Sequence, residues 1–341
     1  MFIAKRYPFW GLVNWSKKYI FIFIVLDSIP ILVYKLLGWH WLAIPWQPIA
    51  LIGIAVSFYL GFKNNSAYDR MWEARKIWGG IVNTSRTFTV MTRDFVTNEF
   101  ASKKLSEEEL STIHKSIVHR HVAWVKALTY QLRMPKPWEH SAKVEVELRK
   151  EGGVHHDENH FEKIKPYLTK NEYDYVMNKG NRASHILSLQ SKELLTLKIN
   201  GQIDDFRHME LEKLVGEFFA LQGKSERIKN FPFPRQYSTV NYLFVWIFLG
   251  LLPFGMLNVF NDSITLLSSG WLVFPFTLLV SWVFILMELI GDYSENPFEG
   301  LYNDVPISTM ARDIEIDIRQ MLDETNLPKP LQPVGPYKIV F

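Results

Sequence analysis

Three large apolar residues, Ile54, Phe58 and Phe62, recur at intervals of four positions. In a helix this spacing places them on one face. Bulky apolar side chains that face a conduction path can gate ions by dewetting, because a passing ion gives up water contacts that the wall cannot replace. An apolar stripe is equally typical of ordinary packing or lipid contact. The spacing alone therefore leaves both a pore neck and a packed helix open.

Acidic residues that follow the second and fourth apolar stretches are the second group of side chains that could act on ions. Glu288, Asp292 and Glu295 follow the last charge-free run, and Asp69 lies on the continuation of the helical face that carries Phe62. A ring of carboxylates in a symmetric channel would favour cations. Solvated acids at the end of a membrane helix are the simpler alternative. We regard Asp69 and Glu288 as candidate charges of a vestibule or pore entrance.

Metal and enzyme chemistry find little support in the sequence. The densest set of metal-type ligands is His155, His156, Asp157 and His160, which lacks a helical His-x-x-x-His register and is typical of a solvated loop. The chain has no cysteine, so it has no disulfide, thiolate metal site or cysteine nucleophile. No phosphate loop, nucleophile elbow or dinucleotide fingerprint occurs. We expect no enzyme activity, no metal, no cofactor and no nucleic-acid partner.

The elements that carry these residues are membrane-spanning helices. Hydrophobic residues make up 48% of the 341 residues and aromatic residues 15%. Residues 41–62, 236–261 and 263–287 contain no charged side chain, and each run is long enough to cross roughly 30 Å of hydrocarbon as a helix. Residues 19–37 form a weaker fourth span, because Asp27, Pro30 and Lys35 interrupt it. Asp27 there predicts packing against a partner or a wet cavity.

Charge asymmetry predicts the topology of the four spans. Lysines and arginines precede the first span, fill residues 63–235 and follow the fourth span, whereas the two other loops have almost none. Because positive residues favour the cytoplasmic side, both termini and the large central block are expected in the cytoplasm. The expected segments are residues 1–62 with spans one and two, a helical cytosolic domain at 63–235, spans three and four at 236–292, and a cytosolic segment at 293–341.

Helix signals fill the central block. The second span has no breaker after Phe62 and is expected to continue as one long helix past Trp78. Ser106, followed by three glutamates, predicts the N-terminal cap of a helix at 105–132. Apolar periodicity predicts further helices at 167–177, 184–199 and 204–221. No strand pattern of useful length occurs. The C-terminal residues from Pro328 onward are proline-rich and expected to be extended.

These features together resemble the bestrophin family, more specifically its bacterial branch. The resemblance covers nearly the whole chain and rests on the order and spacing of several short strings. They are Ile54-x-x-x-Phe58-x-x-x-Phe62, Arg70-Met71-Trp72, Arg75-Lys76-Ile77-Trp78-Gly79, Ser85-Arg86, Arg120-His121, Ala123-Trp124, Gln131-Leu132-Arg133, Gly223 to Ile228, Pro232-x-Pro234-x-x-Tyr237, Glu288 and Asn296-Pro297-Phe298.

The resemblance implies a homopentameric ion channel in the bacterial inner membrane, with one central pore. The second helix of each subunit would line a hydrophobic neck at Ile54, Phe58 and Phe62. A cytosolic aperture would correspond to Ile186, in the string His185-Ile186-Leu187. Animal bestrophins conduct chloride, whereas some bacterial relatives prefer monovalent cations such as sodium or potassium, so the resemblance leaves selectivity open.

Two departures from the animal pattern affect what can be carried over. Met71 stands where animal members have a tryptophan, and Glu299 and Asp304 alone supply too few acids for the animal calcium clasp. We therefore expect gating without calcium. Two other classes remain: a membrane-anchored scaffold or sensor, which the large central block allows, and a secondary carrier, against which the absence of an inverted repeat argues.

Overall fold

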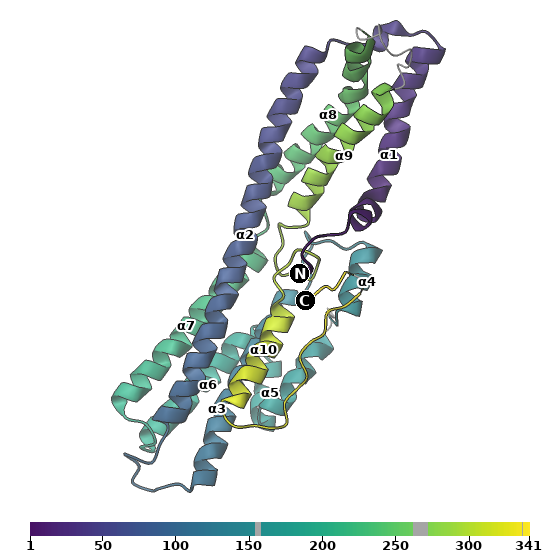
Figure 1. Cartoon of the computed structure of the whole chain (residues 1–341). Helices are drawn as coiled ribbons and strands as arrows, with labels where there is room; N and C mark the ends of the chain where they lie inside the picture. Colours follow the sequence, from purple (N-terminus) through teal and green to yellow (C-terminus); the bar gives the residue numbers. More distant parts are fainter. Residues whose placement is uncertain (154–157, 262–271, 336) are drawn as a thin grey trace. The chain divides into compact units, whose positions relative to one another are not determined.

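The computed structural model describes residues 1–153, 158–261, 272–335 and 337–341, and regular structure in these ranges is helical (Figure 1). Two isolated bridges, Phe2 with Ile339 and Val334 with Ile339, are the only strand-like pairings there. The elements, in chain order, are α1 Phe9–Leu36, η1 His40–Leu42, α2 Trp46–Phe95, α3 Glu107–Arg133, α4 Lys143–Glu151, η2 Glu158–Tyr167, α5 Lys170–Met177, α6 Arg182–Ile199, α7 Asp205–Asn230, α8 Arg235–Asn261, α9 Val273–Asp292 and α10 Ile307–Gln320. The expected all-α class is confirmed.

The chain divides into two compact units. Unit 1 comprises residues 1–3, 71–232 and 296–341, and unit 2 comprises residues 4–70 and 233–295. Helix α2 belongs to both, since its residues up to Arg70 lie in unit 2 and those from Met71 lie in unit 1. The boundaries expected from the sequence follow residues 62, 235 and 292, whereas these divisions follow residues 70, 232 and 295.

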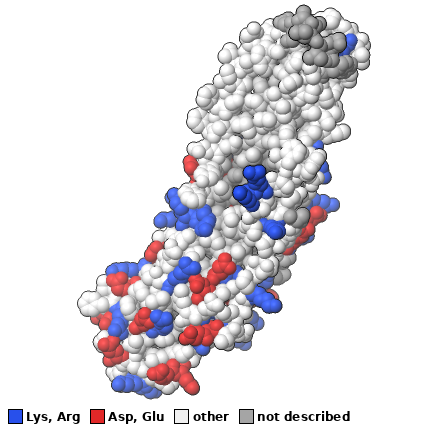
Figure 2. Space-filling model, in the orientation of Figure 1, with Lys and Arg blue, Asp and Glu red and all other residues white. Residues whose placement is uncertain are grey.

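In the described residues, four helices are long and apolar enough to cross a membrane: α2, α8 and α9, as the charge-free runs predicted, and α1, the weaker fourth span. Figure 2 shows almost no charged side chains over the part of the surface that these helices form. Helices α1, α8 and α9 pack on one another around a core that includes Phe23, Leu249 and Ile285. Asp27 of α1 is buried and accepts a hydrogen bond from Ser281 of α9, so its predicted packing against a partner is confirmed.

Helix α2 is 50 residues long and continuous, as the absence of breakers after Phe62 predicted. Its contacts in unit 2 are close at one glycine: a Cβ at Gly53 would lie 2.7 Å from the Phe248 ring of α8. Any side chain there would displace that ring. Small residues therefore bring α2 against α8, as is usual where membrane helices approach closely.

Unit 1 is built around α3, which packs on α6, η2 and α10. Its N-terminus has the predicted cap: the Ser106 side chain accepts from the Glu109 amide, and Glu109 accepts from the Ser106 amide. This capping box satisfies two amides that the helix itself leaves without partners. Toward the middle of α3, Trp124 is fully buried and donates to Gln222 Oε1 of α7 at 2.9 Å.

The turn between α6 and α7 requires glycine. Gly201 has φ +78°, and a Cβ there would lie 2.7 Å from the Phe100 carbonyl oxygen. Backbone atoms cannot move aside as a flexible side chain can, so this turn is fixed against the segment that follows α2. The Thr97 amide also donates to the Gln202 carbonyl at 3.0 Å. The end of α6, the start of α7 and residues 97–101 thus form one corner of unit 1.

The described residues after α10, 321–335 and 337–341, form no helix, as the prolines predicted. It returns along unit 1, where Ile339 and Phe341 are buried with Leu148 and Tyr302. The Phe341 carbonyl oxygen accepts from the Thr309 hydroxyl at 2.9 Å. The last residues therefore belong to the core of their own subunit's unit 1.

Candidate pore-lining site

The stripe Ile54, Phe58 and Phe62 lies on an exposed face of α2. The exposed fractions of these residues are 55%, 65% and 65%. The residues between them that face into unit 2, Val56 and Leu60, are at most 1% exposed. Helix α2 therefore has two distinct apolar faces, one packed in the single chain and one left without cover by it.

The rotation of α2 is fixed by a buried polar cluster next to Phe62. Lys63 is fully buried and donates to Glu288 Oε1 of α9. Asn241 of α8 donates to the other oxygen, Oε2, at 2.7 Å. A buried charge persists only when it is paired and hydrogen-bonded. Turning α2 far enough to bury Phe62 would break the Lys63 pair, so the cluster holds the stripe outward.

Glu288, expected at a pore entrance, is a paired member of this cluster. Its side chain is 3% exposed, and the Lys63 ammonium balances its charge. A carboxylate that is buried and paired presents little charge to a passing ion. In this conformation Glu288 thus acts as an anchor for α2 and α8, and its role as a pore-entrance charge stays a prediction. Sequence reasoning missed Lys63, whose only signal was a lone lysine directly after a charge-free run.

Asp69 lies where the exposed face of α2 becomes polar. It is exposed, and it accepts a hydrogen bond from Asn65 Nδ2 at 3.5 Å, one turn earlier. Ser66 on the same face is exposed as well. The apolar part of α2, residues 46–62, spans roughly 25 Å at about 1.5 Å per residue. That length approaches the roughly 30 Å thickness of the hydrocarbon layer, so the polar residues begin close to its boundary.

Ile186, expected at an aperture, is fully buried in unit 1. It belongs to the same core cluster as Trp124, Leu128 and Phe218. A side chain without exposed surface does not line a path in this conformation, and an aperture at Ile186 stays a prediction. The helical spacing of apolar residues around Ile186 is the same whether that face packs in the core or lines a pore. The sequence alone therefore does not distinguish a core-facing from a pore-facing residue.

Among the described residues of unit 1, the most exposed large apolar side chain is that of Phe206, at 81%. It lies in the first turn of α7, directly after the Asp204 cap, which accepts from the Arg207 amide at 2.7 Å. Ile199 at the end of α6 and Met209 of α7 are exposed nearby in the chain. Sequence reasoning missed Phe206, because a phenylalanine after a helix cap reads as core unless the fold is known.

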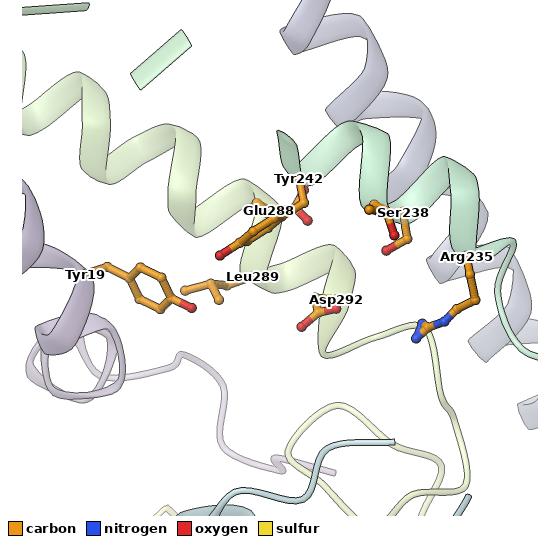
Figure 3. Close-up of a pocket in the computed structure, with 8 residues that line it drawn as sticks. Tyr19, Arg235, Ser238, Tyr242, Glu288, Leu289 and Asp292 are labelled. Carbon is orange, nitrogen blue, oxygen red and sulfur yellow. The ribbon is translucent and has the colours of Figure 1, made fainter. Parts of the chain in front are cut away.

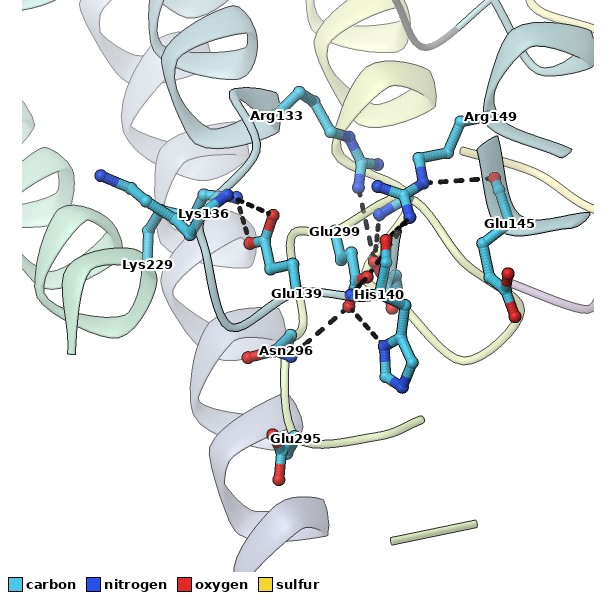
Figure 4. A network of polar contacts seen from close by, with 12 residues as sticks. Arg133, Lys136, Glu139, His140, Glu145, Arg149, Lys229, Glu295, Asn296 and Glu299 are labelled. Atoms are coloured by element: carbon cyan, nitrogen blue, oxygen red, sulfur yellow. Dashed lines mark hydrogen bonds and ion pairs between the residues drawn. The ribbon is translucent and has the colours of Figure 1, made fainter. Parts of the chain in front are cut away.

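Two acidic residues after α9, Glu299 and Asp304, form ion pairs with basic side chains of unit 1 (Figure 4). His140 Nδ1 lies 3.1 Å from Glu299 Oε2, and Arg149 Nη2 lies 3.4 Å from Glu299 Oε1. Arg133 Nη1 lies 3.6 Å from Asp304. Burial raises the pKa of the Glu299 carboxyl, and the hydrogen bond from His140 opposes that rise. Glu299 and Asp304, the two acids singled out in this segment, are thus both engaged by basic side chains of the same chain.

Metal-type ligands do not gather in the described part of the chain. No group of three or more His, Cys, Asp or Glu side chains there could hold a metal ion. His160 has its Nε2 at 2.9 Å from Lys163 Nζ and its ring 5.4 Å from Tyr130. The other members of the expected loop set, His155, His156 and Asp157, lie outside the described residues.

Comparison with known proteins places this geometry in a family of channels. Residues 17–320 match the family described as Bacterial/Fungal Bestrophin protein. The voltage-dependent anion channel-forming protein YneE of Escherichia coli O157:H7 is 26% identical over 293 residues, covering 86% of this chain and 82% of that protein. The voltage-dependent anion channel-forming protein RSc3414 of Ralstonia nicotianae is 29% identical over 293 residues, with 84% and 82% covered.

A solved structure agrees with the fold over nearly the whole chain. The bacterial bestrophin homologue from Klebsiella pneumoniae has a TM-score of 0.72 at 22% identity, covering 91% of this chain and 99% of that one. Its fold and the family match extend over both units. The chain therefore belongs to the bestrophin family, in its bacterial and fungal branch.

Proposed function

We propose that the chain assembles as a homopentameric channel for small monovalent ions, with the stripe Ile54, Phe58 and Phe62 as its neck. The observation that carries this proposal is the exposed face of α2, where an apolar row is followed by polar residues on the same side. The apolar row alone would be compatible with contact to lipid. The same face continues through Asn65 to Asp69 with polar side chains, which are compatible with contact to water. A face that is apolar in one part and polar in the next fits a constriction that opens into a water-filled vestibule.

A single chain cannot enclose a path, so copies of α2 must surround it. An exposed row on one helix of each subunit, repeated around a closed symmetry axis, forms successive rings. Rings of isoleucine and phenylalanine would exclude ions when dry and conduct them when hydrated. Five copies is the number that membership of the family suggests.

Anions are the first candidate for the permeant ion. The bacterial relatives at 24–29% identity are named as anion channel-forming proteins. Monovalent cations are the second candidate, favoured by the exposed carboxylate of Asp69, about two helical turns beyond Phe62. The neck itself carries no formal charge, so selectivity would arise from dehydration and from charges near the ends of the rings.

The reversal potential of the purified protein in a planar bilayer under a sodium chloride gradient tests this proposal. A value near the chloride equilibrium potential supports anion conduction, and one near the sodium value supports the cation alternative. The channel proposal itself is contradicted by absence of current in protein shown to be inserted and assembled, which would favour a scaffold or sensor. A saturable flux far below channel rates would favour a carrier.

Phe206 replaces Ile186 as the residue proposed for a second constriction in unit 1. A constriction needs a bulky side chain that the subunit itself does not cover, and Phe206 meets this condition while Ile186 does not. Its place on the first turn of α7, fixed by the Asp204 cap and the Gly201 turn, gives it a defined direction. The Phe206 side chains of five subunits would together form an apolar aperture.

The distribution of positive charge supports placing unit 1 and both termini in the cytoplasm, with the four spans in the inner membrane. Lysines and arginines concentrate outside the spans in the segments assigned to that side. Accessibility of single cysteines introduced at Asp174 and at Trp39 to a membrane-impermeant thiol reagent tests this topology. Labelling of position 39 and protection of position 174 in intact cells is the expected result.

A further inference from the structure

A cavity of about 350 Å³ lies in unit 2 among α1, α8 and α9. Its size is at the lower end of the ~300–1,000 Å³ range of small-molecule sites. Most of its lining residues are polar, among them Tyr19, Arg235, Ser238, Tyr242, Glu288 and Asp292. Figure 3 shows the Tyr19 hydroxyl and the Asp292 carboxylate directed toward one another across this space.

The cavity lies at the charged ends of three spans. Arg235 directly precedes the charge-free residues 236–261, Glu288 directly follows the charge-free residues 263–287, and Tyr19 directly follows two lysines. Such positions mark the level at which hydrocarbon gives way to lipid headgroups. A ligand that reaches this cavity from the membrane would therefore present its headgroup to it.

The charges around the cavity suit a ligand that carries both signs. The ionisable lining residues are Glu288, Asp292 and Arg235. Lys63 pairs with Glu288 and Glu295 pairs with Arg235 from outside the lining, so these five side chains together carry one net negative charge. Arg235 is partly exposed, and its Nη1 lies 2.7 Å from Glu295, which holds the guanidinium at the edge of the cavity. A guanidinium recognises a phosphate through several parallel hydrogen bonds. The excess of carboxylate favours an ammonium beside that phosphate.

We propose that this cavity binds the headgroup of phosphatidylethanolamine, with Arg235 on the phosphodiester and Asp292 on the primary ammonium. The hydroxyls of Ser238, Tyr242 and Tyr19 supply acceptors for the remaining N–H groups. A quaternary ammonium has no N–H to donate and is recognised mainly by aromatic faces, of which the lining offers only two. An anionic headgroup would meet the net negative charge without an ammonium to offset it. The proposal does not depend on the channel proposal.

Native mass spectrometry of the intact assembly tests this site, using detergent micelles with equal amounts of phosphatidylethanolamine, phosphatidylcholine and phosphatidylglycerol. The wild-type assembly is expected to retain phosphatidylethanolamine in preference to the other two. Asp292→Asn should lower the ratio of bound ethanolamine to choline lipid about tenfold, because a hydrogen bond to a charged group is lost. Asp292→Glu should restore much of the ratio, and Arg235→Gln should weaken retention of all three lipids.

The control is Asp174→Asn, which removes an exposed carboxylate in α5 of unit 1 and should leave the ratio unchanged. The assembly mass in the same spectrum shows whether each variant is folded. Equal retention of the three lipids by the wild type, or an unchanged ratio in Asp292→Asn, would overturn the proposal. Binding of soluble glycerophosphoethanolamine as tight as that of the lipid would assign the cavity to a soluble ligand instead.

Discussion

Lys63 of α2 donates to Glu288 of α9, 225 residues away, while the preceding residue, Phe62, remains 65% exposed. The side chains of Lys63 and Phe62 point to different sides of the same turn of α2. A buried ion pair of this kind has one geometry in which both charges are satisfied. It therefore sets the rotation of α2 and, with it, the direction of the whole stripe from Ile54 to Phe62.

Breaking this pair should destabilise the assembled protein strongly. Lys63→Met leaves Glu288 buried with Asn241 as its remaining partner, and removal of one member of a buried pair typically costs about 3–5 kcal/mol. The double variant Lys63→Met/Glu288→Met removes both charges and should be more stable than either single variant. Denaturation of the assembly in detergent, followed through dissociation of the subunits, measures the three variants.

The matched control is an ion pair on the surface of unit 1. Arg86 Nε lies 2.5 Å from Asp317 Oδ2, but both side chains are substantially exposed. Exposed pairs contribute about 0–1 kcal/mol, so Arg86→Met should change stability little. If Lys63→Met and Arg86→Met had the same small effect, the Lys63–Glu288 pair would not fix α2.

Local sequence rules predicted much of this fold. Three of the four spans followed from charge-free runs and the fourth from a weaker apolar run. The long α2 followed from the absence of breakers, and the start of α3 from Ser106 and its glutamates. Each of these depends on interactions within about one helical turn or on solvent preference along a single segment. Such information is present in any short stretch of the chain.

Pairings between distant segments were beyond these rules. The partner of Glu288 lies on another helix, and the sequence around Ile186 has the same apolar period whether that face meets the core or a pore. Exposure is a property of the packed chain, so the face of a helix that remains uncovered is known only once its neighbours are placed. This explains why both the burial of Ile186 and the exposure of Phe206 were missed.

Alanine at the proposed neck should raise ion conductance. Phe58→Ala widens a ring and reduces the dry length that an ion must cross, so single-channel current should increase severalfold. Phe62→Ala and Ile54→Ala should act in the same direction. Bilayer recordings at fixed salt concentration measure this effect. The matched control is Phe21→Ala on α1, since Phe21 is exposed to the same degree as Phe58. An equal effect of both variants would place the neck elsewhere.

Substitution of Phe206 should change the ion selectivity of the channel but have little effect on the stability of the protein. Phe206→Ala removes an exposed ring, so the relative permeability of large to small ions of the same charge should rise while the unfolding midpoint stays nearly constant. Ile186→Ala should do the opposite: it opens a cavity in the core and costs about 2–5 kcal/mol, with permeability ratios unchanged. Bi-ionic reversal potentials distinguish the two. A shifted ratio in Ile186→Ala alone would return the aperture to α6.

Acid should destabilise unit 1 through His121. Complete burial lowers the pKa of His121 from 6.5 to about 3, so the folded protein keeps this ring neutral while the unfolded chain protonates it. Stability from this group is full above pH 6.5 and falls as the pH drops from there toward 3. Linkage gives a loss of about 2 kcal/mol between pH 8 and pH 5.

His121→Phe isolates this contribution from other titrating groups. The ring already packs on Phe88, Trp124 and Phe218, at centroid distances of 4.5–5.3 Å, so phenylalanine suits the site. Ser85, which lies 2.8 Å from His121 Nε2, keeps its hydrogen bond to the Ile81 carbonyl. The fall in unfolding free energy from pH 8 to pH 5 should be about 2 kcal/mol smaller in His121→Phe than in the wild type. Ser85→Ala retains the histidine and should retain the wild-type slope, whereas identical slopes in the wild type and His121→Phe would show that His121 does not govern acid sensitivity.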